Sequence, residues 1–351
     1  MNVAVIGLGS MGKRRIRLIQ SNFKDVNIVG LDKIEEKCKE AEELFSIKTS
    51  TDSDNILSNT DIDAVFISTS PLSHSKLIKD VLNRNINVFT ELNLVNDLYD
   101  ENIKLASDNN LTLFLSSTQL YRKEINHITE VINKSNKQTN YIYHIGNYLP
   151  DWHPWENYKD FFVGDKRTNG CREILAIELP WLINTFGEVE KIYVTKDKMT
   201  DLEIDYPDSF LITIQHKSGD KGNLIVDLVS RKPVRNLEII NEDFYFSWDG
   251  SPTGLQKYNI TTNEAENIDL YDEIASESNY NETIIENAYL EEIYDFFDAI
   301  SNNKPHGKYS FNEDKYILNL IDVIENSNDN TVYDFWLIWK TIKFALLVLA
   351  Q

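Results

Sequence analysis

The first third of the chain alternates short apolar runs with longer segments of mixed polarity. Residues 3–6, Val-Ala-Val-Ile, form an uninterrupted apolar run, which is typical of a parallel strand that is buried on both faces. Similar runs follow, each separated from the next by enough residues for a helix or a long loop, at residues 26–31, 63–68, 87–90 and 111–115. Strands and helices that alternate in this way predict βαβ units, and hence a parallel sheet that binds its ligand at the carboxyl ends of the strands.

Beyond Tyr121 the hydrophobic pattern changes its period. A predicted helix at residues 124–133 leads to a strand at residues 141–146, and a second helix is predicted at residues 170–186. Apolar and polar residues then alternate with period two in strands at residues 191–195, 209–216, 222–230, 236–240 and 244–248. This alternation predicts a largely antiparallel sheet, with one face packed by helices and the other face open. Amphipathic helices at residues 282–302 and 312–326 close the predicted fold. We therefore assign residues 121–330 to an α+β domain with a large, mostly antiparallel open sheet.

A glycine motif directly follows the first apolar run. It has the form GxGxxG at residues 7–12, and a predicted helix comes next. In such a unit the first glycine allows the tight turn, the second lets a pyrophosphate approach the backbone, and the third lets helix and strand pack closely. The helix N-terminus adds free N–H groups. Residues 1–120 are thus predicted to form a Rossmann dinucleotide-binding domain, and the fold class is α/β. The cofactor contacts predicted here are Gly7, Gly9, Ser10, Met11 and Gly12.

The second apolar run is followed by Asp32. This acidic residue stands about 20–25 residues past the first glycine of the motif, where a carboxylate should bind the ribose hydroxyls of a dinucleotide. The same carboxylate would repel a 2′-phosphate, which favours NAD over NADP. Arg14, Arg15 and Lys33 are close in sequence and keep NADP possible. The predicted cofactor is therefore a nicotinamide dinucleotide, with NAD preferred.

Composition narrows the class of partner. At 351 residues the chain is long enough for two domains, and its 42% hydrophobic and 26% charged residues are typical of a soluble globular protein. The formal net charge of −21 argues against a nucleic-acid partner, because nucleic acids are bound by clustered lysine and arginine. Cys38 and Cys171 are far apart and have no metal-like spacing. Since no signal-peptide pattern is visible either, we expect a cytoplasmic protein without a metal site.

One apolar segment stands apart near the C-terminus. Residues 332–350 are rich in Trp, Phe and Leu, and we predict an apolar helix over residues 331–351. Asp334, Lys340 and Lys343 interrupt the segment, so it is a poor membrane-spanning helix, which needs about 20 mostly apolar residues. Three interpretations stay open: a helix packed on the protein's own core, a helix at an oligomer interface, and a helix lying on a membrane surface.

Further motifs stand where the predicted strands end. Ser-Thr-Ser-Pro-x-x-His occupies residues 68–74, Val-Phe-Thr-Glu occupies residues 88–91, and a later helix ends in Phe-Gly at residues 186–187. With the glycine motif and the domain order, these motifs resemble the Gfo/Idh/MocA family, the glucose–fructose oxidoreductase and inositol dehydrogenase group, over about residues 1–325. The resemblance implies an NAD(P)-dependent oxidoreductase of sugars, polyols or nucleotide sugars, and by family habit a homodimer or homotetramer. The further cofactor contacts predicted at these strand ends are Ser70, Pro71, His74 and Glu91.

Two motifs depart from the family pattern. In the family's Glu-Lys-Pro motif, Leu92 replaces Lys and Asn93 replaces Pro. When the later helix is aligned on its terminal Phe-Gly, Ile177 takes the position of the usual acid–base His and Pro180 that of the usual Asp. Leucine and isoleucine cannot carry a proton. Either the chemistry has therefore moved to other residues, or the domain binds a dinucleotide without ordinary turnover.

An aromatic loop and the helix after it offer replacement residues. Hydride transfer from an alcohol carbon needs a base within hydrogen-bond reach of the hydroxyl. Interleaved Trp and polar residues suit a sugar, whose apolar face stacks on an aromatic ring. Of Glu173 and Glu178, at least one is expected to be a structural partner of Arg172, and Glu178, beside the missing His, is preferred as the functional one. The predicted catalytic residues are His153, Glu178 and Tyr121, and the predicted substrate contacts are Trp152, Trp155, Glu156, Tyr158, Arg172 and Arg122, with Tyr121 and Arg122 chosen by family position.

Three functions are compatible with these residues. The first is an NAD(P)-linked oxidoreductase that acts on a sugar or nucleotide-sugar, with bacterial surface-glycan biosynthesis as a setting. The second is a lyase or epimerase that keeps NAD bound and uses it transiently, without net redox change. The third is a non-catalytic protein that binds NAD or a sugar, which the replacement of Lys and His favours.

Overall fold

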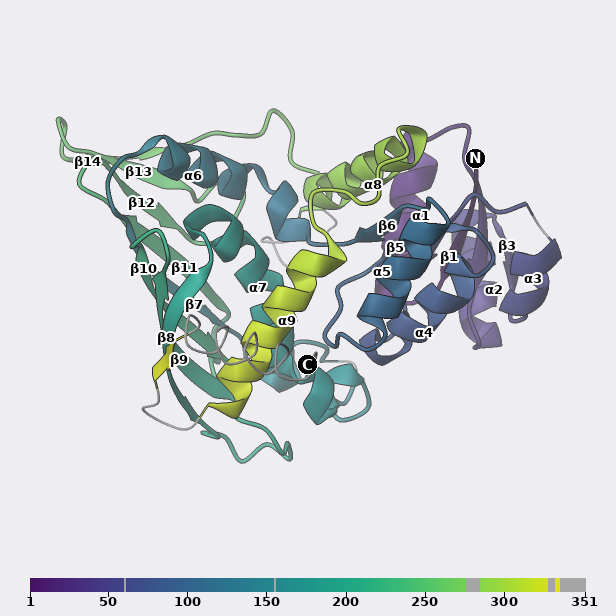
Figure 1. The fold of residues 1–351 in the computed structure, drawn as a ribbon, viewed down its shortest axis with the longest axis horizontal. Coiled ribbons are helices and arrows are strands. Elements are labelled where there is room, and N and C mark those ends of the chain that lie inside the picture. The colour runs from purple at the N-terminus through teal and green to yellow at the C-terminus, as the bar shows by residue number, and fades with distance from the viewer. Residues whose placement is uncertain (60, 155, 276–284, 328–331, 335–351) are drawn as a thin grey trace, which may run out of the picture. The chain divides into compact units, whose positions relative to one another are not determined.

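The computed structural model describes residues 1–59, 61–154, 156–275, 285–327 and 332–334 (Figure 1). It divides the chain into two compact units. The first comprises Met1–Tyr121 and Glu286–Asn319, and the second comprises the described parts of Arg122–Ile285 and Leu320–Gln351. The chain leaves the first unit next to the predicted boundary at residue 120. Residues 286–319, which the sequence pattern assigns to the second domain, belong to the first unit.

A six-stranded parallel sheet forms the centre of the first unit. Its strand order is β3-β2-β1-β4-β5-β6, and every strand pair is parallel. This is the doubly wound order of a Rossmann fold, so the fold predicted for the N-terminal domain is confirmed. The strands are β1 (Asn2–Ile6), β2 (Asn27–Leu31), β3 (Lys48–Ser50), β4 (Ala64–Ile67), β5 (Asn87–Thr90) and β6 (Leu113–Leu115). The helices are α1 (Ser10–Asn22), α2 (Glu35–Phe45), α3 (Ser53–Asn59), α4 (Pro71–Leu82), α5 (Tyr99–Asp108), α8 (Glu286–Ser301) and α9 (Phe311–Asn326), which begins in this unit.

Helix α8 packs on this sheet through phenylalanine rings. Phe296 lies edge-on to Phe66, Phe89 and Phe114, with ring centroids 5.3–5.5 Å apart. All four side chains are fully buried. Burial of one such ring removes about 150–250 Å² of apolar surface from water, so α8 is part of the core of the first unit. The amphipathic pattern predicts this helix but does not say which sheet it covers.

A nine-stranded sheet forms the second unit. Its order is β14-β13-β12-β11-β7-β10-β9-β8-β15, and only β7 and β10 pair in parallel. The predicted large, mostly antiparallel sheet is therefore confirmed. Its strands are β7 (Asn140–Gly146), β8 (Val189–Asp197), β9 (Ser209–His216), β10 (Lys221–Asp227), β11 (Val234–Ile240), β12 (Tyr245–Trp248), β13 (Gln256–Asn259), β14 (Glu264–Asn267) and β15 (Val332–Asp334). The sequence analysis missed β13 and β14, because both are polar and lack the alternation used to find the other strands.

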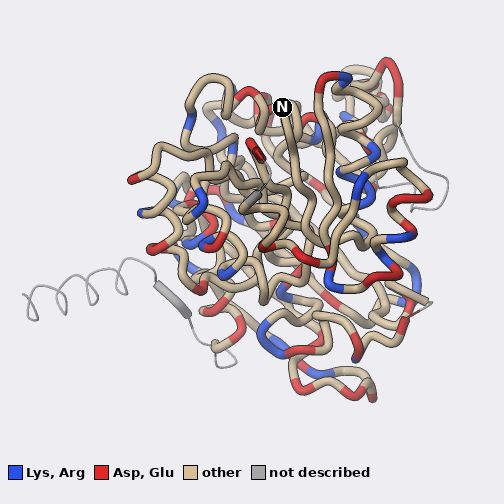
Figure 2. Tube along the Cα trace, turned by 90° about the vertical axis from the view of Figure 1, so that its right-hand side faces the viewer, with Lys and Arg blue, Asp and Glu red and all other residues tan. Residues whose placement is uncertain are grey.

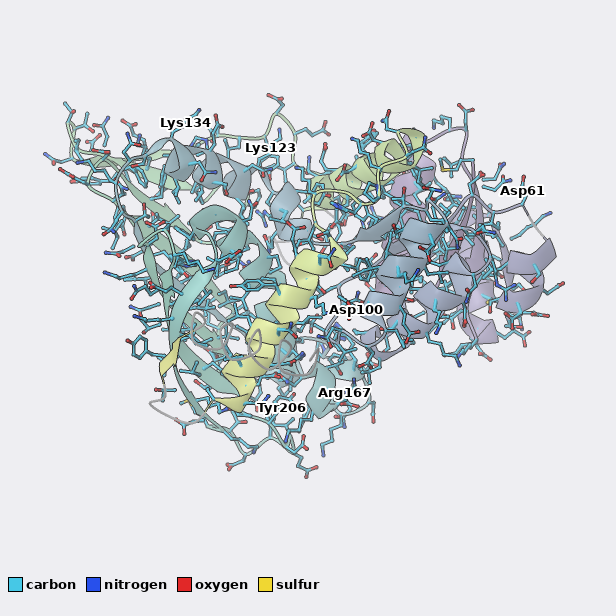
Figure 3. The ribbon with its side chains drawn as sticks, in the orientation of Figure 1. Asp61, Asp100, Lys123, Lys134, Arg167 and Tyr206 are labelled. Carbon is cyan, nitrogen blue, oxygen red and sulfur yellow. The ribbon has the colours of Figure 1, made fainter. Side chains whose placement is uncertain are left out.

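Helices cover one face of the second sheet. In β7 the side chains of Tyr141 and Tyr143 are buried on that face, whereas Ile142 between them is 43% exposed on the other face. The covering helices are α6 (Lys123–Lys134), whose two ends are labelled in Figure 3, and α7 (Gly170–Phe186). The alternation predicted from sequence therefore corresponds to one packed face and one face with exposed apolar side chains.

The C-terminal segment is described only in part. Val332–Asp334 forms β15, which pairs antiparallel with β8, where the sequence analysis predicted the start of a helix. The rest of that predicted helix, residues 335–351, lies outside the described residues. Within the described part of the chain, no helix is long and apolar enough to cross a membrane. Figure 2 shows that acidic positions are spread along the described trace instead of being gathered in one run.

Candidate cofactor and substrate sites

The turn after β1 can be formed only with glycine at two positions. Gly7 has a φ of +94°, and its N–H donates to the carbonyl of Leu31 at 2.8 Å. A Cβ atom on Gly7 would lie 2.5 Å from the carbonyl oxygen of Ser68, and one on Gly12 would lie 1.8 Å from that of Gly7. Since no side chain fits there, the first and third glycines of the motif have the roles that the sequence predicts.

The middle glycine is different, because it faces open space. A Cβ atom on Gly9 would meet no atom within 4 Å. Gly9 is the N-cap of α1, which begins at Ser10 without a side-chain capping hydrogen bond. The sulfur of Met11 accepts a hydrogen bond from Arg14 Nη1 at 3.0 Å, within the same helix. The start of α1 therefore fits a pyrophosphate, with backbone donors beside space that the protein does not fill.

Asp32 is held in place at the end of β2. Its Oδ2 accepts from the backbone N–H of Leu8 at 2.8 Å, and its Oδ1 accepts from that of Ile34 at 3.0 Å. Each carboxylate oxygen can accept a second hydrogen bond. The carboxylate is thus fixed beside the glycine turn and keeps acceptor capacity for the hydroxyls of a ribose.

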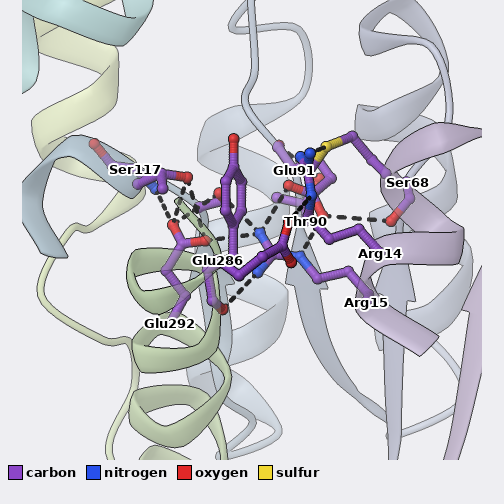
Figure 4. Close-up of polar contacts among 12 residues, drawn as sticks. Arg14, Arg15, Ser68, Thr90, Glu91, Ser117, Glu286 and Glu292 are labelled. Carbon is purple, nitrogen blue, oxygen red and sulfur yellow. Dashed lines mark hydrogen bonds and ion pairs between the residues drawn. The ribbon is translucent and has the colours of Figure 1, made fainter. Parts of the chain in front are cut away.

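Two of the three cations that kept NADP possible are engaged inside the first unit (Figure 4). Arg15 is fully buried and forms a fork with Glu91, with Nε 2.7 Å from Oε1 and Nη2 3.0 Å from Oε2. Arg14 Nε lies 3.1 Å from Glu286 Oε1. Both arginine side chains are buried, whereas Lys33 is exposed. The predicted cofactor contact Glu91 is the buried partner of Arg15 in this arrangement.

A second carboxylate, Glu292, completes the cluster and fixes the loop after β6. It accepts from Arg15 Nη2 at 2.7 Å, from Ser116 Oγ at 2.8 Å and from the backbone N–H of Ser117 at 2.9 Å. Burial raises the pKa of Glu292, and the neighbouring Arg15 opposes that rise. The predicted catalytic residue Tyr121 also has a partner here: its hydroxyl donates to Asp295 at 2.6 Å, and burial raises its pKa. These contacts support a structural role for Tyr121.

His74 organises the turn that precedes and opens α4. Its Nε2 lies 2.9 Å from the carbonyl oxygen of Thr69 and its Nδ1 lies 2.8 Å from Asn93 Oδ1. Burial lowers the pKa of His74, and the contacts of the ring with Asn93 and Thr69 oppose that change. Both ring nitrogens are engaged by the protein, and the predicted cofactor contacts Ser70 and Pro71 lie on the turn that they hold. Asn93, which stands where the family has Pro, therefore has a structural role, because it holds the ring of His74.

Glu178 lies inside the second unit. Its side chain is fully buried, and its carboxylate accepts from the hydroxyl of Tyr143 at 2.7 Å and from Trp181 Nε1 at 2.8 Å. Arg235 Nη1 lies 2.6 Å from the other carboxylate oxygen. This position on α7 faces the sheet, and the carboxylate is engaged by two protein donors and one ion pair, which supports a structural role instead of the predicted catalytic one.

Two predicted substrate contacts also have protein partners. Arg172 forms ion pairs with Asp322 at 2.8 Å and with Glu325 at 2.5 Å, instead of pairing with one of the carboxylates on its own helix as expected. Arg122 pairs with Glu124 at 2.7 Å, and both side chains are buried. The ion pairs of Arg172 connect α7 to α9, whereas the Arg122–Glu124 pair is local to the start of α6.

The aromatic loop keeps the imidazole of His153 partly exposed. Its Nδ1 lies 3.6 Å from Glu156 Oε2, and both side chains are about 42–43% exposed. The ring stacks on Phe161 with centroids 4.7 Å apart. The hydroxyl of Tyr158 accepts from the backbone of a neighbouring loop. The predicted contact Trp155 lies outside the described residues.

A cavity of about 290 Å³ opens beside this loop, within the second unit. Trp152, from the predicted substrate contacts, forms part of its wall. Its apolar side chains suit the face of a small ring, and its polar groups suit hydroxyls. The complete lining is Ile145, Gly146, Asn147, Trp152, Glu173, Ile174, Ile177, Pro233, Val234 and Arg235.

Glu173 lines the cavity, although the sequence favours Glu178 as the functional carboxylate of this helix. Its side chain has no hydrogen-bond or ion-pair partner among the described residues, and burial raises its pKa to about 7. A signal was available: Glu173 precedes Ile177 by four residues, so both lie on one face of α7. Ile177 is the position of the missing His. That face of the helix meets the cavity.

Comparison with known proteins agrees with this geometry. Residues 1–114 match the model of the oxidoreductase family with an NAD-binding Rossmann fold, GFO_IDH_MocA. The first 114 residues thus resemble the NAD-binding domain of the Gfo/Idh/MocA family. The family binds NAD, and the turn at residues 7–12 with Asp32 supplies the fitting groups. No curated protein matches the sequence.

Solved structures of oxidoreductases match nearly the whole chain in fold, at low sequence identity. An oxidoreductase from Agrobacterium radiobacter, in complex with NAD⁺, L-tartaric acid and magnesium, has a TM-score of 0.78 and 14% identity over 96% of this chain and 99% of its own. A myo-inositol dehydrogenase from Corynebacterium glutamicum has a TM-score of 0.72 and 18% identity, over 92% of this chain and 95% of its own. UDP-N-acetylglucosamine 3-dehydrogenase from Acidithiobacillus ferrooxidans has a TM-score of 0.70 and 18% identity, over 91% of this chain and 95% of its own. These similarities extend the shared fold to the second unit.

Proposed function

We propose that the chain is an NAD-dependent oxidoreductase that transfers a hydride between the cofactor and a polyhydroxylated compound. The observation that carries this proposal is the turn at residues 7–12, where Gly9 faces open space while Gly7 and Gly12 admit no side chain. When bound there, NAD supplies a hydride acceptor. Asp32 would hold the ribose hydroxyls, and the start of α1 would hold the pyrophosphate.

The substrate cavity supports a compound the size of one sugar ring. A volume of about 290 Å³ is at the lower limit for small-molecule sites, and Trp152 offers an aromatic wall. A myo-inositol dehydrogenase shares the fold, and so does an enzyme that acts on UDP-N-acetylglucosamine. The cavity volume favours a sugar or polyol over a nucleotide-sugar.

Oxidation of an alcohol to a carbonyl releases one hydride and one proton, so a proton acceptor is required. Of the three residues predicted for catalysis, Tyr121 and Glu178 already donate to or accept from protein groups. His153 retains a partly exposed ring, with Glu156 placed to orient it. We therefore keep His153 as the proposed base, because an imidazole beside a carboxylate is suited to proton transfer near neutral pH.

We also propose that the chain self-associates, that it is located in the cytoplasm, and that it takes part in surface-glycan biosynthesis. The open face of the second sheet carries apolar side chains, with Tyr193 45% and Leu211 50% exposed. These side chains support a homodimer or homotetramer formed through that face. Light scattering of the purified chain, with Leu211→Lys as the disrupting variant, tests this part of the proposal.

Calorimetric titration with NAD, followed by a search for NADH absorbance across a panel of sugars and polyols, tests the function. We expect NAD to bind and at least one compound to be oxidised. NAD retained after purification without net reduction would favour the lyase or epimerase alternative. NAD binding without any turnover would favour a binding protein. Failure to bind NAD would overturn the proposal altogether.

A further inference from the structure

Of the charged side chains that line the cavity in the second unit, one has a counter-charge and the other has none among the described residues. Two charged side chains line it, Glu173 from α7 and Arg235 from β11. Arg235 is already compensated, because its Nη1 lies 2.6 Å from the carboxylate of Glu178 and 2.9 Å from the hydroxyl of Tyr143. The guanidinium and its buried partner therefore add no net charge to the cavity.

Glu173 has no such compensation. No described residue donates a hydrogen bond to its carboxylate or pairs with it, and Ile174, Ile177 and Trp152 share its part of the lining. An ionised carboxylate that is partly removed from water and lacks a counter-charge is disfavoured relative to its neutral form. The rise of its pKa to about 7 has this single cause. A ligand cation would supply the missing charge.

A second acceptor in the cavity lacks a donor. The Oδ1 atom of Asn147 is buried and has no hydrogen-bond partner among the residues that the structure describes. Two unpartnered acceptors, one of them a carboxylate, thus belong to one small cavity. A group with several N–H donors and a positive charge would satisfy both, and an ammonium group has three donors.

We propose that this cavity selects a substrate with a basic nitrogen, of the amino-sugar class, and that Glu173 binds its ammonium group. The inference rests on the proposed function only for the sugar-like scaffold of the ligand. Anionic ligands are disfavoured, because the cavity holds no uncompensated positive charge to meet a carboxylate or a phosphate.

Calorimetric titration of three matched probes tests the proposal. Glucosamine, glucose and glucuronate differ mainly in one substituent, which is cationic, neutral or anionic at pH 7. Each is titrated into the full chain with and without NAD, and into Glu173→Gln and Glu188→Gln. Glu188 is an exposed carboxylate paired with Lys217 and serves as the matched control. Thermal unfolding confirms that each variant is folded.

We expect glucosamine to bind the unmodified chain about tenfold more tightly than glucose, and glucuronate to bind most weakly. Glu173→Gln should reduce the preference for glucosamine to within about twofold, whereas Glu188→Gln should retain it. Equal affinity for glucosamine and glucose, a preference that survives Glu173→Gln, tightest binding of glucuronate, or binding of none of the probes would each overturn the proposal. Because the titrations without NAD are independent of the cofactor, failure of NAD binding would overturn the proposed function alone.

Discussion

The two units differ in how completely protein groups pair their carboxylates. In the first unit, Glu91 and Glu292 share the guanidinium of Arg15, and hydroxyl and backbone groups supply further donors. In the second unit, Glu178 is equally well paired with Arg235, but Glu173, five residues earlier on the same helix, has no partner in the described structure. A carboxylate that is saturated by the protein holds the fold, whereas one that is left without donors is available to a ligand. Three changes test this contrast, and a fourth tests the cofactor turn of the first unit.

The largest expected effect comes from removing the shared cation of the first unit. Arg15→Ala leaves two buried carboxylates without their counter-charge, and we expect a loss of about 3–5 kcal/mol in the free energy of unfolding. Urea unfolding measures it. Lys13→Ala is the control, because both side chains of the Lys13–Glu40 pair reach solvent, with 23% and 55% exposed, and the pair should contribute less than about 1 kcal/mol. A similar loss in both variants would show that the buried cluster is not special.

Glu178→Gln tests the paired carboxylate of the second unit. The change leaves Arg235 without its counter-ion, and we expect a loss of about 2–3 kcal/mol in stability, with NAD affinity unchanged. Unfolding and NAD titration of the same preparation measure both. If the variant were as stable as the parent, Glu178 would not be a structural residue, and its predicted catalytic role would regain support.

Gly9→Val tests the open position of the cofactor turn. Since a Cβ atom there meets no protein atom, the variant should fold normally, while its side chain occupies the space proposed for the pyrophosphate. We expect NAD affinity to fall about thirtyfold, equivalent to about 2 kcal/mol, by titration. Gly12→Ala is the contrasting variant, because its Cβ would collide with the carbonyl of Gly7 and should lower the melting temperature too. Normal NAD binding by Gly9→Val would contradict the assignment.

The smallest effect concerns the unpaired carboxylate and depends on pH. The pKa of Glu173 is raised from 4.5 to about 7 in the folded chain, so between these values the native state binds more protons than the unfolded state. Stability therefore falls as pH rises through this window and stays lower above it. Glu173→Gln should match the parent at pH 4 and exceed it by about 1–2 kcal/mol at pH 8, which is less than the full pKa change would give because Glu173 is partly exposed. Thermal unfolding at both pH values measures the difference, and equal stability at pH 8 would contradict it.

Most of the fold follows from local sequence patterns. The apolar runs identify five of the six strands in the first sheet, and the glycine motif identifies the turn that binds the cofactor. The short strand β3 and helix α3 lie in a segment without a clear period, and the sequence does not reveal them. The placement of α8 could not be read either, because its partner rings, Phe66, Phe89 and Phe114, are far away in the chain.

The candidate site was harder to predict than the fold, since it depends on which direction each side chain takes. The position of Glu178 beside the missing His predicts a functional role. In the structure Glu178 faces the sheet, accepts hydrogen bonds from Tyr143 and Trp181, and forms an ion pair with Arg235. Glu173 shares the helix face of Ile177, and helical periodicity alone would have favoured it. The partners of Arg172 come from α9, about 150 residues further on, and no local pattern encodes them.

The return of the chain through α8 has a consequence for synthesis and for protein engineering. During translation the first sheet emerges long before Phe296, so its phenylalanine face has no cover until the ribosome has also made the intervening second unit. A fragment cut at Tyr121 to isolate the cofactor domain would keep that face exposed and should aggregate. A fragment that joins residues 1–121 to residues 286–319 by a short linker carries its own cover and is the better soluble module.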